Sequence, residues 1–289
     1  MKSKSPYPTA FLAPALVLFG GFFVLPTLMG FYLAFTRYSV YQSSLGFTGW
    51  ANFTYLFQHP QFLTAFWNTF EFAFFSTLLK TFIGLMLALL LVRPLRGGGL
   101  LRTVFYMPAV LSPIIAAVMF QAVFRMDGLL NTALAAVGLE SAAMDWMGRP
   151  DTVMGTVVTM AVWKWAGFNM AIFIAGLQAI PVSYYEAASI DGASGFTQLR
   201  RITLPLIIPA LGINLTSNLI GGLNVFEQVL GLTGGGPGYA SQVIGTLVYQ
   251  SYSQGYYGRA SAMGMIQIVI TLVLGVLLYK GITRQETEA

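Results

Sequence analysis

The sequence predicts an all-α integral membrane protein with about six transmembrane helices. Only 9% of its 289 residues are charged and 56% are hydrophobic, and the mean hydropathy is +0.70, whereas about a quarter of the residues in a soluble domain are charged. The apolar residues also form blocks of about 20, the length that crosses a bilayer as a helix. Within each block they follow one another without alternation, which argues against a β-barrel.

Six apolar blocks are expected to form the spans, and each should be helical because hydrocarbon offers no partner to an unsatisfied backbone N–H or C=O group. The blocks cover residues 10–35, 69–92, 101–124, 152–177, 203–226 and 260–280. The first is too long for the apolar region of a signal peptide and lacks an obvious cleavage site, so we expect an uncleaved helix. Prolines within or beside the blocks are expected to kink or start helices: Pro26, Pro108, Pro113, Pro205 and Pro209.

The distribution of Lys and Arg predicts the orientation, because cytoplasmic loops carry an excess of basic residues. With a cytoplasmic N-terminus, the cytoplasmic group is Lys2, Lys4, Arg93, Arg96, Arg102, Arg200, Arg201, Lys280 and Arg284. The outer group is smaller and consists of Arg37, Arg125, Arg149 and Arg259. We therefore expect a multi-pass protein of the inner (cytoplasmic) membrane, in contact with lipid, with both termini in the cytoplasm and residues 1–289 forming one transmembrane domain.

Several function classes are disfavoured by composition. The formal charge of +5 is too small and too scattered for a nucleic-acid-binding surface. The chain has no Cys, hence no disulfide, thiolate metal site or Cys nucleophile. Its single histidine, His59, cannot form a His-cluster metal site, so we expect no metal and no catalytic residues. No nucleotide-binding G-x-x-x-x-G-K-[ST] motif occurs, so we expect no cofactor in this chain and any ATP chemistry to belong to a partner.

The polar segment 180–209 is predicted to be a cytoplasmic helix-turn-helix. Ser183 and Glu186 have the spacing of a capping box, and Asp191-Gly192 is a helix stop because glycine readily adopts the left-handed conformation. Ser194 is expected to cap a second short helix, and Pro205 to open the fifth span. Such a loop fits the groove of a partner protein, but it is equally compatible with an amphipathic loop lying on the membrane surface.

Glu186-Ala187-Ala188, Asp191-Gly192-Ala193 and Ile202-Thr203-Leu204-Pro205, at their mutual spacing, resemble the EAA motif of binding-protein-dependent ABC importer permeases. Other stretches resemble the sugar-uptake branch, of the maltose F type and the glycerol-3-phosphate A type. These are Leu12-Ala13-Pro14, Asn68-Thr69, Met107-Pro108, Gly128-Leu129-Leu130-Asn131 and Leu232-Thr233-Gly234-Gly235-Gly236-Pro237. Compared with the maltose F type, the chain is expected to lack two extra N-terminal spans and a large outer domain.

The resemblance implies a type I ABC importer permease fold that moves a sugar or related solute by alternating access. It implies that residues 178–205 form the coupling loop, with Glu186 supplying a charge contact, Ala187 and Ala188 a close fit to the ATPase, and Asp191-Gly192 the turn. The implied partners are a second homologous permease, a cytoplasmic ATPase dimer that carries ATP and Mg, and an extracytoplasmic solute-binding protein. The chain itself is not expected to be an enzyme.

Polar and aromatic residues inside the fourth and fifth blocks are candidates for a substrate site, because a polar group at bilayer depth usually faces a cavity or a partner. The resemblance points to the same two spans. The candidates are Trp163, Lys164, Trp165, Phe168, Asn169, Asn218, Gly222, Asn224 and Val225. The alternatives are that Lys164 extends to the interface and that the Asn residues, Asn214 included, hydrogen-bond between helices. Lys80, nine residues after Glu71, is expected to pack against the second permease.

The main alternative function is that of a secondary transporter or channel subunit. Such a protein would show inverted repeats or acidic proton-relay residues within its spans, and neither is evident in the sequence. An intramembrane enzyme would need a nucleophile–base pair or a metal site, and the single histidine lies outside the spans.

Overall fold

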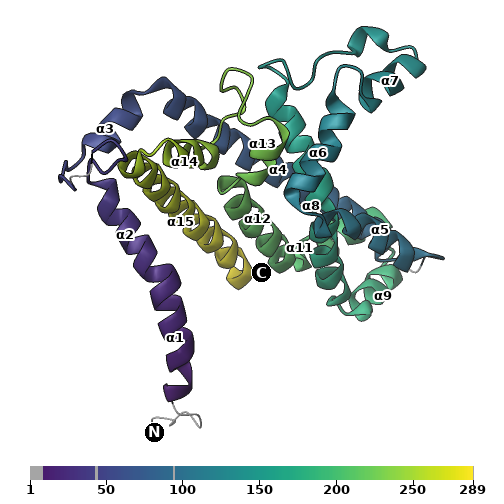
Figure 1. Cartoon of the computed structure of the whole chain (residues 1–289). Coiled ribbons are helices and arrows are strands. Elements are labelled where there is room, and N and C mark those ends of the chain that lie inside the picture. The colour runs from purple at the N-terminus through teal and green to yellow at the C-terminus, as the bar shows by residue number, and fades with distance from the viewer. Residues whose placement is uncertain (1–8, 43–44, 94, 289) are drawn as a thin grey trace. The chain divides into compact units, whose positions relative to one another are not determined.

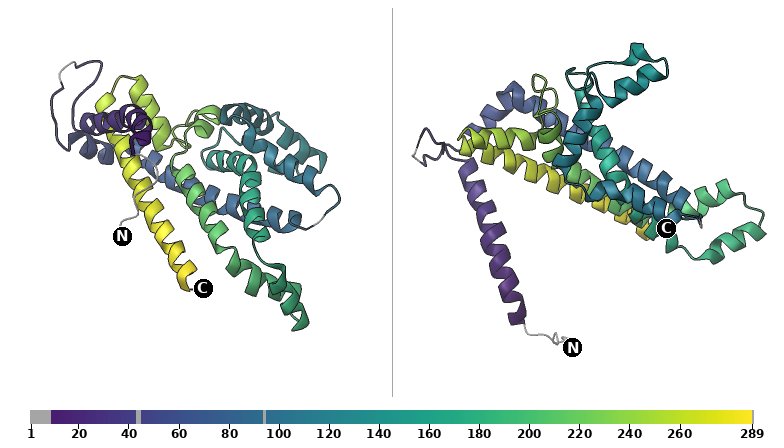
Figure 2. Two further views of the ribbon diagram at one scale, coloured as in Figure 1. Left: turned by 90° about the horizontal axis from the view of Figure 1, so that it is seen from below. Right: turned by 45° about the vertical axis from the view of Figure 1, so that its right-hand side comes forward.

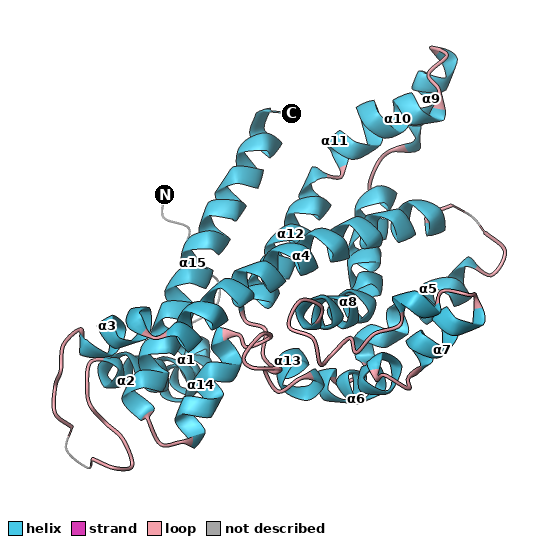
Figure 3. Ribbon diagram, turned by 90° about the horizontal axis from the view of Figure 1, so that it is seen from above, coloured by secondary structure: helices cyan, strands magenta, loops and turns pink. Residues whose placement is uncertain are grey.

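The computed structural model describes residues 9–42, 45–93 and 95–288, and these are helical almost throughout (Figure 3). Apart from the isolated bridges Thr36–Phe47 and Ser39–Gln42, the described ranges contain no β-structure. The chain divides into two compact units, residues 1–59 with 247–268, and residues 60–246 with 269–289. Lys2 and Lys4, counted in the orientation argument, lie outside the described residues, and the side chain of Arg284 is not described either.

The first unit begins with a continuous helical rod formed by η1 (Thr9–Leu12), α1 (Ala13–Phe19), a π-helical turn η2 (Gly20–Val24) and α2 (Leu25–Ala34) (Figure 1). This confirms the first predicted span, and Pro26 lies in the first turn of α2 as expected. Between Ala13 and Ala34 only Ala34 is buried, so the apolar side chains of this part of the rod face outward, as in a helix that contacts lipid. The unit also holds α3 (Ala51–Gln58) and the beginning of the last helix, α15 (Tyr257–Glu288).

The second unit is a helical bundle centred on α8. Its elements are α4 (Pro60–Leu91), α5 (Gly98–Val110), α6 (Pro113–Phe124), α7 (Leu129–Ala136), η3 (Glu140–Ala142), α8 (Val153–Gln178), α9 (Val182–Ile190), α10 (Gly195–Gln198), η4 (Leu199–Thr203), α11 (Leu204–Leu206), α12 (Ile208–Leu223) and α13 (Glu227–Leu232). A further helix, α14 (Ile244–Ser253), spans the boundary between the units. Helix α8 packs against α4, α5 and α12. Two apolar clusters fill the bundle, one around Val157 and Val229 and the other around Phe173 and Leu177.

The third predicted span, residues 101–124, is divided by the structure. Helix α5 ends at Val110, Leu111 and Ser112 are extended with ψ of 145° and 139°, and α6 starts at Pro113. The reason is local, since a residue before proline is pushed out of the helical region and proline is well suited to the first helical position. At 13 residues, α5 is too short to cross a bilayer alone.

The fifth predicted span, residues 203–226, is bent. The segment Gly195–Leu206 meets α12 at an angle of 62°, and Pro209 rather than Pro205 lies in the first turn of α12. Pro205 instead begins the short α11. The described residues hold five helices that are long and apolar enough to span a membrane, or six if this bent pair counts as one span. This count of five or six agrees with the predicted number of about six spans.

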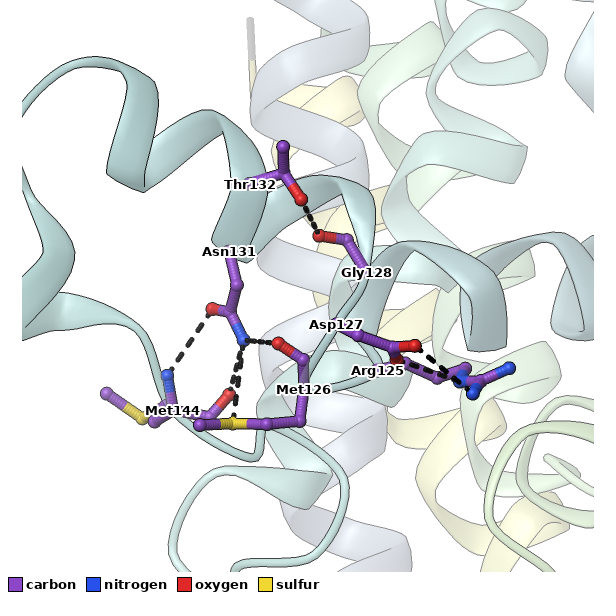
Figure 4. Close-up of polar contacts among 7 residues, drawn as sticks. All are labelled: Arg125, Met126, Asp127, Gly128, Asn131, Thr132 and Met144. Carbon is purple, nitrogen blue, oxygen red and sulfur yellow. Dashed lines mark hydrogen bonds and ion pairs between the residues drawn. The ribbon is translucent and has the colours of Figure 1, made fainter.

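The loop between α6 and α8 is fixed by the side-chain amide of Asn131, in the first turn of α7 (Figure 4). Its Nδ2 donates to the carbonyl oxygens of Met126 and Met144, at 3.0 and 2.9 Å. Its Oδ1 accepts from the backbone N–H of Met144 at 3.3 Å and from Nε1 of Trp146 at 2.8 Å. This buried side chain therefore ties three parts of the loop together, and the structure gives the Gly128–Asn131 stretch a local structural role.

Candidate functional site

Helix α9 ends in a turn built around Gly192. The backbone N–H of Gly192 donates to Ser189 O at 3.1 Å, and that of Ala193 to Ala188 O at 2.9 Å. This pair of bonds is a Schellman motif, which requires a left-handed residue after the helix. Gly192 supplies it with φ of 77°. The predicted helix stop at Asp191-Gly192 is confirmed.

The predicted capping box is wrong. The N-cap of α9 is Pro181, whose side chain makes no cap bond, and the backbone N–H of Tyr184 donates to its carbonyl at 3.2 Å. Ser183 therefore lies inside the first turn of the helix. A side chain accepts from the free backbone N–H groups of that turn when it occupies the N-cap position, which Pro181 holds here. Glu186 is free of that role, and its exposed carboxylate makes no ion pair with the described residues.

The return arm, α10 to α11, is bonded to α9 by side-chain hydrogen bonds that the sequence analysis did not predict. Gln198 Nε2 donates to Ser189 Oγ at 2.9 Å, and the hydroxyls of Tyr185 and Thr203 lie 3.0 Å apart. Ser194 caps α10 as predicted, its Oγ accepting from the N–H of Thr197 at 3.3 Å. These bonds make residues 182–206, here called the α9 hairpin, a defined body.

The α9 hairpin projects from the helical bundle of the second unit (Figures 2 and 3). No residue of α9 is buried. Two large apolar side chains of the hairpin are exposed to a high degree, Ile190 of α9 at 86% and Phe196 of α10 at 72%. Glu186 and Ala187 are also exposed, and Ala188 is half-buried. Large apolar side chains exposed in this way are typical of a surface that another protein covers.

Lys164 lies where α5 breaks. It is 1% exposed, and its Nζ donates to the carbonyl oxygens of Pro108, Ala109 and Leu111. The interruption before α6 ends the regular helical bonding here, although Pro108 O also accepts from the backbone N–H of Leu111 at 3.3 Å. The ammonium therefore supplies a donor to the C-terminal end of α5. Its Nζ also lies 4.6 Å from the ring centroid of Trp165. With these contacts, Lys164 neither reaches the membrane interface nor points to an open cavity.

The amides of Asn169 and Asn218 bond to each other between α8 and α12. Asn218 Nδ2 donates to Asn169 Oδ1 and also to Thr81 Oγ1 of α4, the latter at 3.2 Å. Asn169 Nδ2 donates to Trp165 O at 2.8 Å, and both Asn side chains are buried. Three helices are therefore linked by one polar network, the arrangement expected of interhelical hydrogen bonding.

Gly222 and Val225 serve packing. A Cβ at Gly222 would lie 2.8 Å from Ala73 Cα, so the glycine permits α12 to approach α4 closely. Val225 is 2% exposed and belongs to the apolar cluster around Val157.

The expected position of Lys80 against a second permease is contradicted, because this side chain is only 5% exposed within the chain itself. Glu71, nine residues earlier on the same helix, is exposed.

The side chains of the four remaining substrate candidates are at least partly exposed at the surface of the chain. Trp163 and Phe168 are each 37% exposed on α8, a helix whose residues are mostly buried. Trp165 is half-buried and its ring meets that of Phe168 edge-on, with centroids 5.9 Å apart. Asn224, just beyond the end of α12, is exposed. Of the nine candidates these four can meet a ligand in this conformation, and their role as substrate contacts stays a prediction.

We expect Lys164→Met to lower the stability of the detergent-solubilised protein by about 2–4 kcal/mol, because three part-buried carbonyls at the end of α5 would lose the ammonium that donates to them. Lys80→Met is the matched control, since Lys80 is a buried span lysine for which the structure shows no hydrogen bond to a described residue. That replacement should be neutral or stabilising. Thermal unfolding of both variants measures the difference, and a larger loss for Lys80→Met would contradict this role of Lys164.

The Gly-rich segment 231–242 is held more firmly than a flexible loop. Asn68 Nδ2 donates to the carbonyl oxygens of Ala240 and Gln242, both at 2.9 Å, and Gln121 Nε2 donates to Gly231 O at 2.9 Å. Within the loop, the hydroxyls of Thr233 and Ser241 lie 2.7 Å apart. The sequence signal was the amide of Asn68 directly before the second apolar block. The sequence does not show that the Gly-rich loop lies beside it.

Comparison with known proteins gives concordant matches. Residues 80–285 match the family described as "Binding-protein-dependent transport system inner membrane component". The chain is 34% identical to the probable ABC transporter permease protein YurN of Bacillus subtilis, over 94% of each protein. It is also 34% identical to the trehalose/maltose transport system permease protein MalF of Thermococcus litoralis, over 93% of this chain and 91% of that protein.

Among solved structures, the chain is similar to one in a bacterial ABC transporter involved in the import of the acidic polysaccharide alginate. The identity is 28%, the TM-score is 0.82, and the match covers 95% of this chain and 94% of the other. A second structure of the alginate transporter, in complex with its alginate pentasaccharide-bound periplasmic protein, matches with a TM-score of 0.80, 28% identity, and coverage of 93% and 91%.

Proposed function

Because this chain belongs to the family of inner-membrane components of binding-protein-dependent transport systems, we propose that it conducts a sugar or oligosaccharide into the cell and is driven through its α9 hairpin. The chain is a multi-pass permease subunit of an ABC importer and has the fold of such permeases. Family membership also sets aside the secondary transporter and channel alternatives.

The α9 hairpin is the observation that supports the coupling role. It is held together by side-chain hydrogen bonds, its helix α9 has no buried residue, and its apolar residues Val182, Ile190 and Phe196 are exposed. We assign the contact with a cytoplasmic ATPase to Glu186, Ala187 and Ala188, and the turn to Asp191 and Gly192. Closure of the ATPase dimer on ATP and Mg would then push the hairpin as a rigid body and bias the bundle between two states.

The proposed assembly contains a second homologous permease, a dimer of ATPase subunits and an extracytoplasmic solute-binding protein. The chain alone leaves a large apolar surface, including the rod Ala13–Ala34, which lipid and a second permease would cover. Relatives are described as permeases for trehalose or maltose, arabino-oligosaccharides and lactose. We propose a carbohydrate of this range as the substrate.

Substrate contact is assigned to the accessible aromatic residues Trp163, Trp165 and Phe168 of α8, with Asn224 beyond the end of α12. Aromatic faces suit the C–H faces of sugar rings, and an amide suits their hydroxyls. Lys164, Asn169, Asn218, Gly222 and Val225 are reassigned to holding the helices around this surface, because their contacts occupy them in this conformation.

The test is uptake by the complete transporter in proteoliposomes, with the solute-binding protein loaded in turn with trehalose, an arabino-oligosaccharide, lactose or an alginate oligosaccharide. One sugar should be accumulated in an ATP-dependent manner. Phe168→Ala should raise the half-saturating concentration for that sugar about five- to tenfold. Phe22→Ala, an exposed phenylalanine of the rod, is the control and should leave it unchanged. Equal effects of the two replacements would refute the substrate assignment but not the coupling role.

A further inference from the structure

A cavity of about 520 Å³ lies in the first unit, where α2 ends and α15 begins. It is formed by the segment after Ala34, by α3 and by the first turn of α15. The polar groups that line it include Arg37, Tyr38, Gln42, Asn52, Tyr55 and Arg259. None of these residues belongs to the coupling hairpin or to the proposed substrate contacts.

The cavity carries two positive charges without an acidic counterpart. Segments 1–59 and 247–268 contain no Asp or Glu at all. The ion pairs of the described residues, Arg125–Asp127 and Arg149–Asp151, lie elsewhere in the chain. The guanidinium groups of Arg37 and Arg259 make no ion pair with any residue in the described part of the chain, so an anion from outside would be their natural partner.

Arg259 is held in a fixed orientation. Its guanidinium carbon lies 4.0 Å from the ring centroid of Tyr55 and 5.1 Å from that of Tyr256. Stacking on aromatic faces occupies the plane of the guanidinium and leaves its in-plane N–H donors available to a phosphate or carboxylate. Asn52 adds an acceptor to the cavity. Its Nδ2 donates to Ala34 O at 2.7 Å and to Thr36 O at 2.8 Å, so its Oδ1 can accept a hydrogen bond from a ligand.

The position of the cavity matches the headgroup layer of a bilayer. The rod Ala13–Ala34 is a candidate span whose apolar window has no buried residue, and Arg37 follows its end by three residues. Arg259 lies in the first turn of the last candidate span. Tyrosine rings gather here, with Tyr38 and Tyr257 centroids 5.3 Å apart, and tyrosine is enriched at the membrane–water interface.

We propose that this cavity binds the headgroup of an anionic phospholipid. The phosphodiester would lie between Arg37 and Arg259, and headgroup hydroxyls such as those of phosphatidylglycerol would meet Asn52 and Gln42. A soluble anion that combines a phosphate or carboxylate with neighbouring hydroxyls offers the same chemistry, so the test must distinguish the two sources. The uncompensated charge at the end of a lipid-exposed span favours the lipid.

The experiment is native mass spectrometry of the complete transporter released from phosphatidylglycerol vesicles, comparing wild type with the double variant Arg37→Gln, Arg259→Gln. Retention of phosphatidylglycerol should fall about ten- to thirtyfold, since each basic residue near a membrane surface contributes roughly fivefold. The control is Arg125→Gln, Arg149→Gln, which removes two exposed arginines that already have acidic partners and should retain the lipid. Arg37→Lys, Arg259→Lys should restore part of the binding if charge is the cause.

Three outcomes would overturn the proposal. The first is equal retention by the wild type and the Gln double variant at equal thermal stability. The second is displacement of the lipid by glycerol 1-phosphate at concentrations comparable to the lipid, which would identify a site for soluble anions. The third is unchanged lipid retention with a loss of ATPase stimulation by the binding protein, which would identify a protein-docking surface. None of these outcomes bears on whether the α9 hairpin couples transport to ATP.

Discussion

Gly192→Asp is expected to abolish ATP-driven uptake while leaving the chain folded and in the membrane. Gly192 has φ of 77°, and a Cβ there would meet nothing within 4 Å inside this chain. The substitution therefore costs only local backbone strain of about 1 kcal/mol, because Asp tolerates the left-handed conformation better than most residues. Its carboxylate would instead enter the surface that we assign to the ATPase, where it would be buried without a partner.

Gly138→Asp is the matched control for that replacement. Gly138 follows α7 with φ of 78°, and a Cβ there would also meet nothing within 4 Å, so the strain and the local space are the same. It lies in the loop between α6 and α8, away from the α9 hairpin. Uptake and ATPase activity in proteoliposomes should be lost with Gly192→Asp and kept with Gly138→Asp. Full uptake by Gly192→Asp would refute the coupling assignment.

Gly167→Ala is expected to lower stability more than any other single methyl group added to α8. A Cβ at Gly167 would overlap Phe105 O and would lie 2.8 Å from Tyr106 Cα, both backbone atoms of α5. Neither neighbour can rotate away, so the two helices would have to separate. The expected loss is about 3 kcal/mol, the upper range for overpacking. Because α5 also carries the carbonyls that Lys164 satisfies, the shift would weaken those bonds as well.

Gly155→Ala provides the comparison on the same helix. Gly155 is exposed and its Cβ would meet nothing within 4 Å, so alanine should stabilise the helix by about 0.5–1 kcal/mol. Thermal unfolding of the solubilised transporter should therefore shift in opposite directions for the two variants. A melting temperature for Gly167→Ala equal to that of Gly155→Ala would mean that the helices are not in backbone contact.

Local chemistry made parts of the fold predictable from sequence. The first, second, fourth and last spans follow from long apolar runs, and the turn at Gly192 follows from a residue that can adopt positive φ without strain. Pro113 indicated a break at the start of α6. Apolar composition still presented residues 101–124 as one block, because only two extended residues, Leu111 and Ser112, divide it. The capping box failed because Pro181 starts the helix two residues earlier than the Ser183 pattern requires.

The polar residues inside the spans could not be assigned from sequence, because their partners are distant along the chain. Lys164 bonds to carbonyls 53 to 56 residues away, and Asn169 bonds to Asn218. A pattern on one helix does not reveal which carbonyls a break in another helix leaves unsatisfied. Only the assembled bundle separates Trp163 and Phe168, which remain accessible, from Asn169, which does not.

The central claim, that the α9 hairpin docks on an ATPase subunit, is tested most directly by site-specific cross-linking. The chain has no Cys, so Ala187→Cys gives this subunit a single thiol, which a maleimide–benzophenone reagent can label in the complete transporter. Val137→Cys is the control, because Val137 is 70% exposed in the loop between α6 and α8. Illumination should join the Ala187→Cys subunit, and not the Val137→Cys subunit, to the ATPase. Efficient labelling of Ala187→Cys without any ATPase adduct would contradict the account.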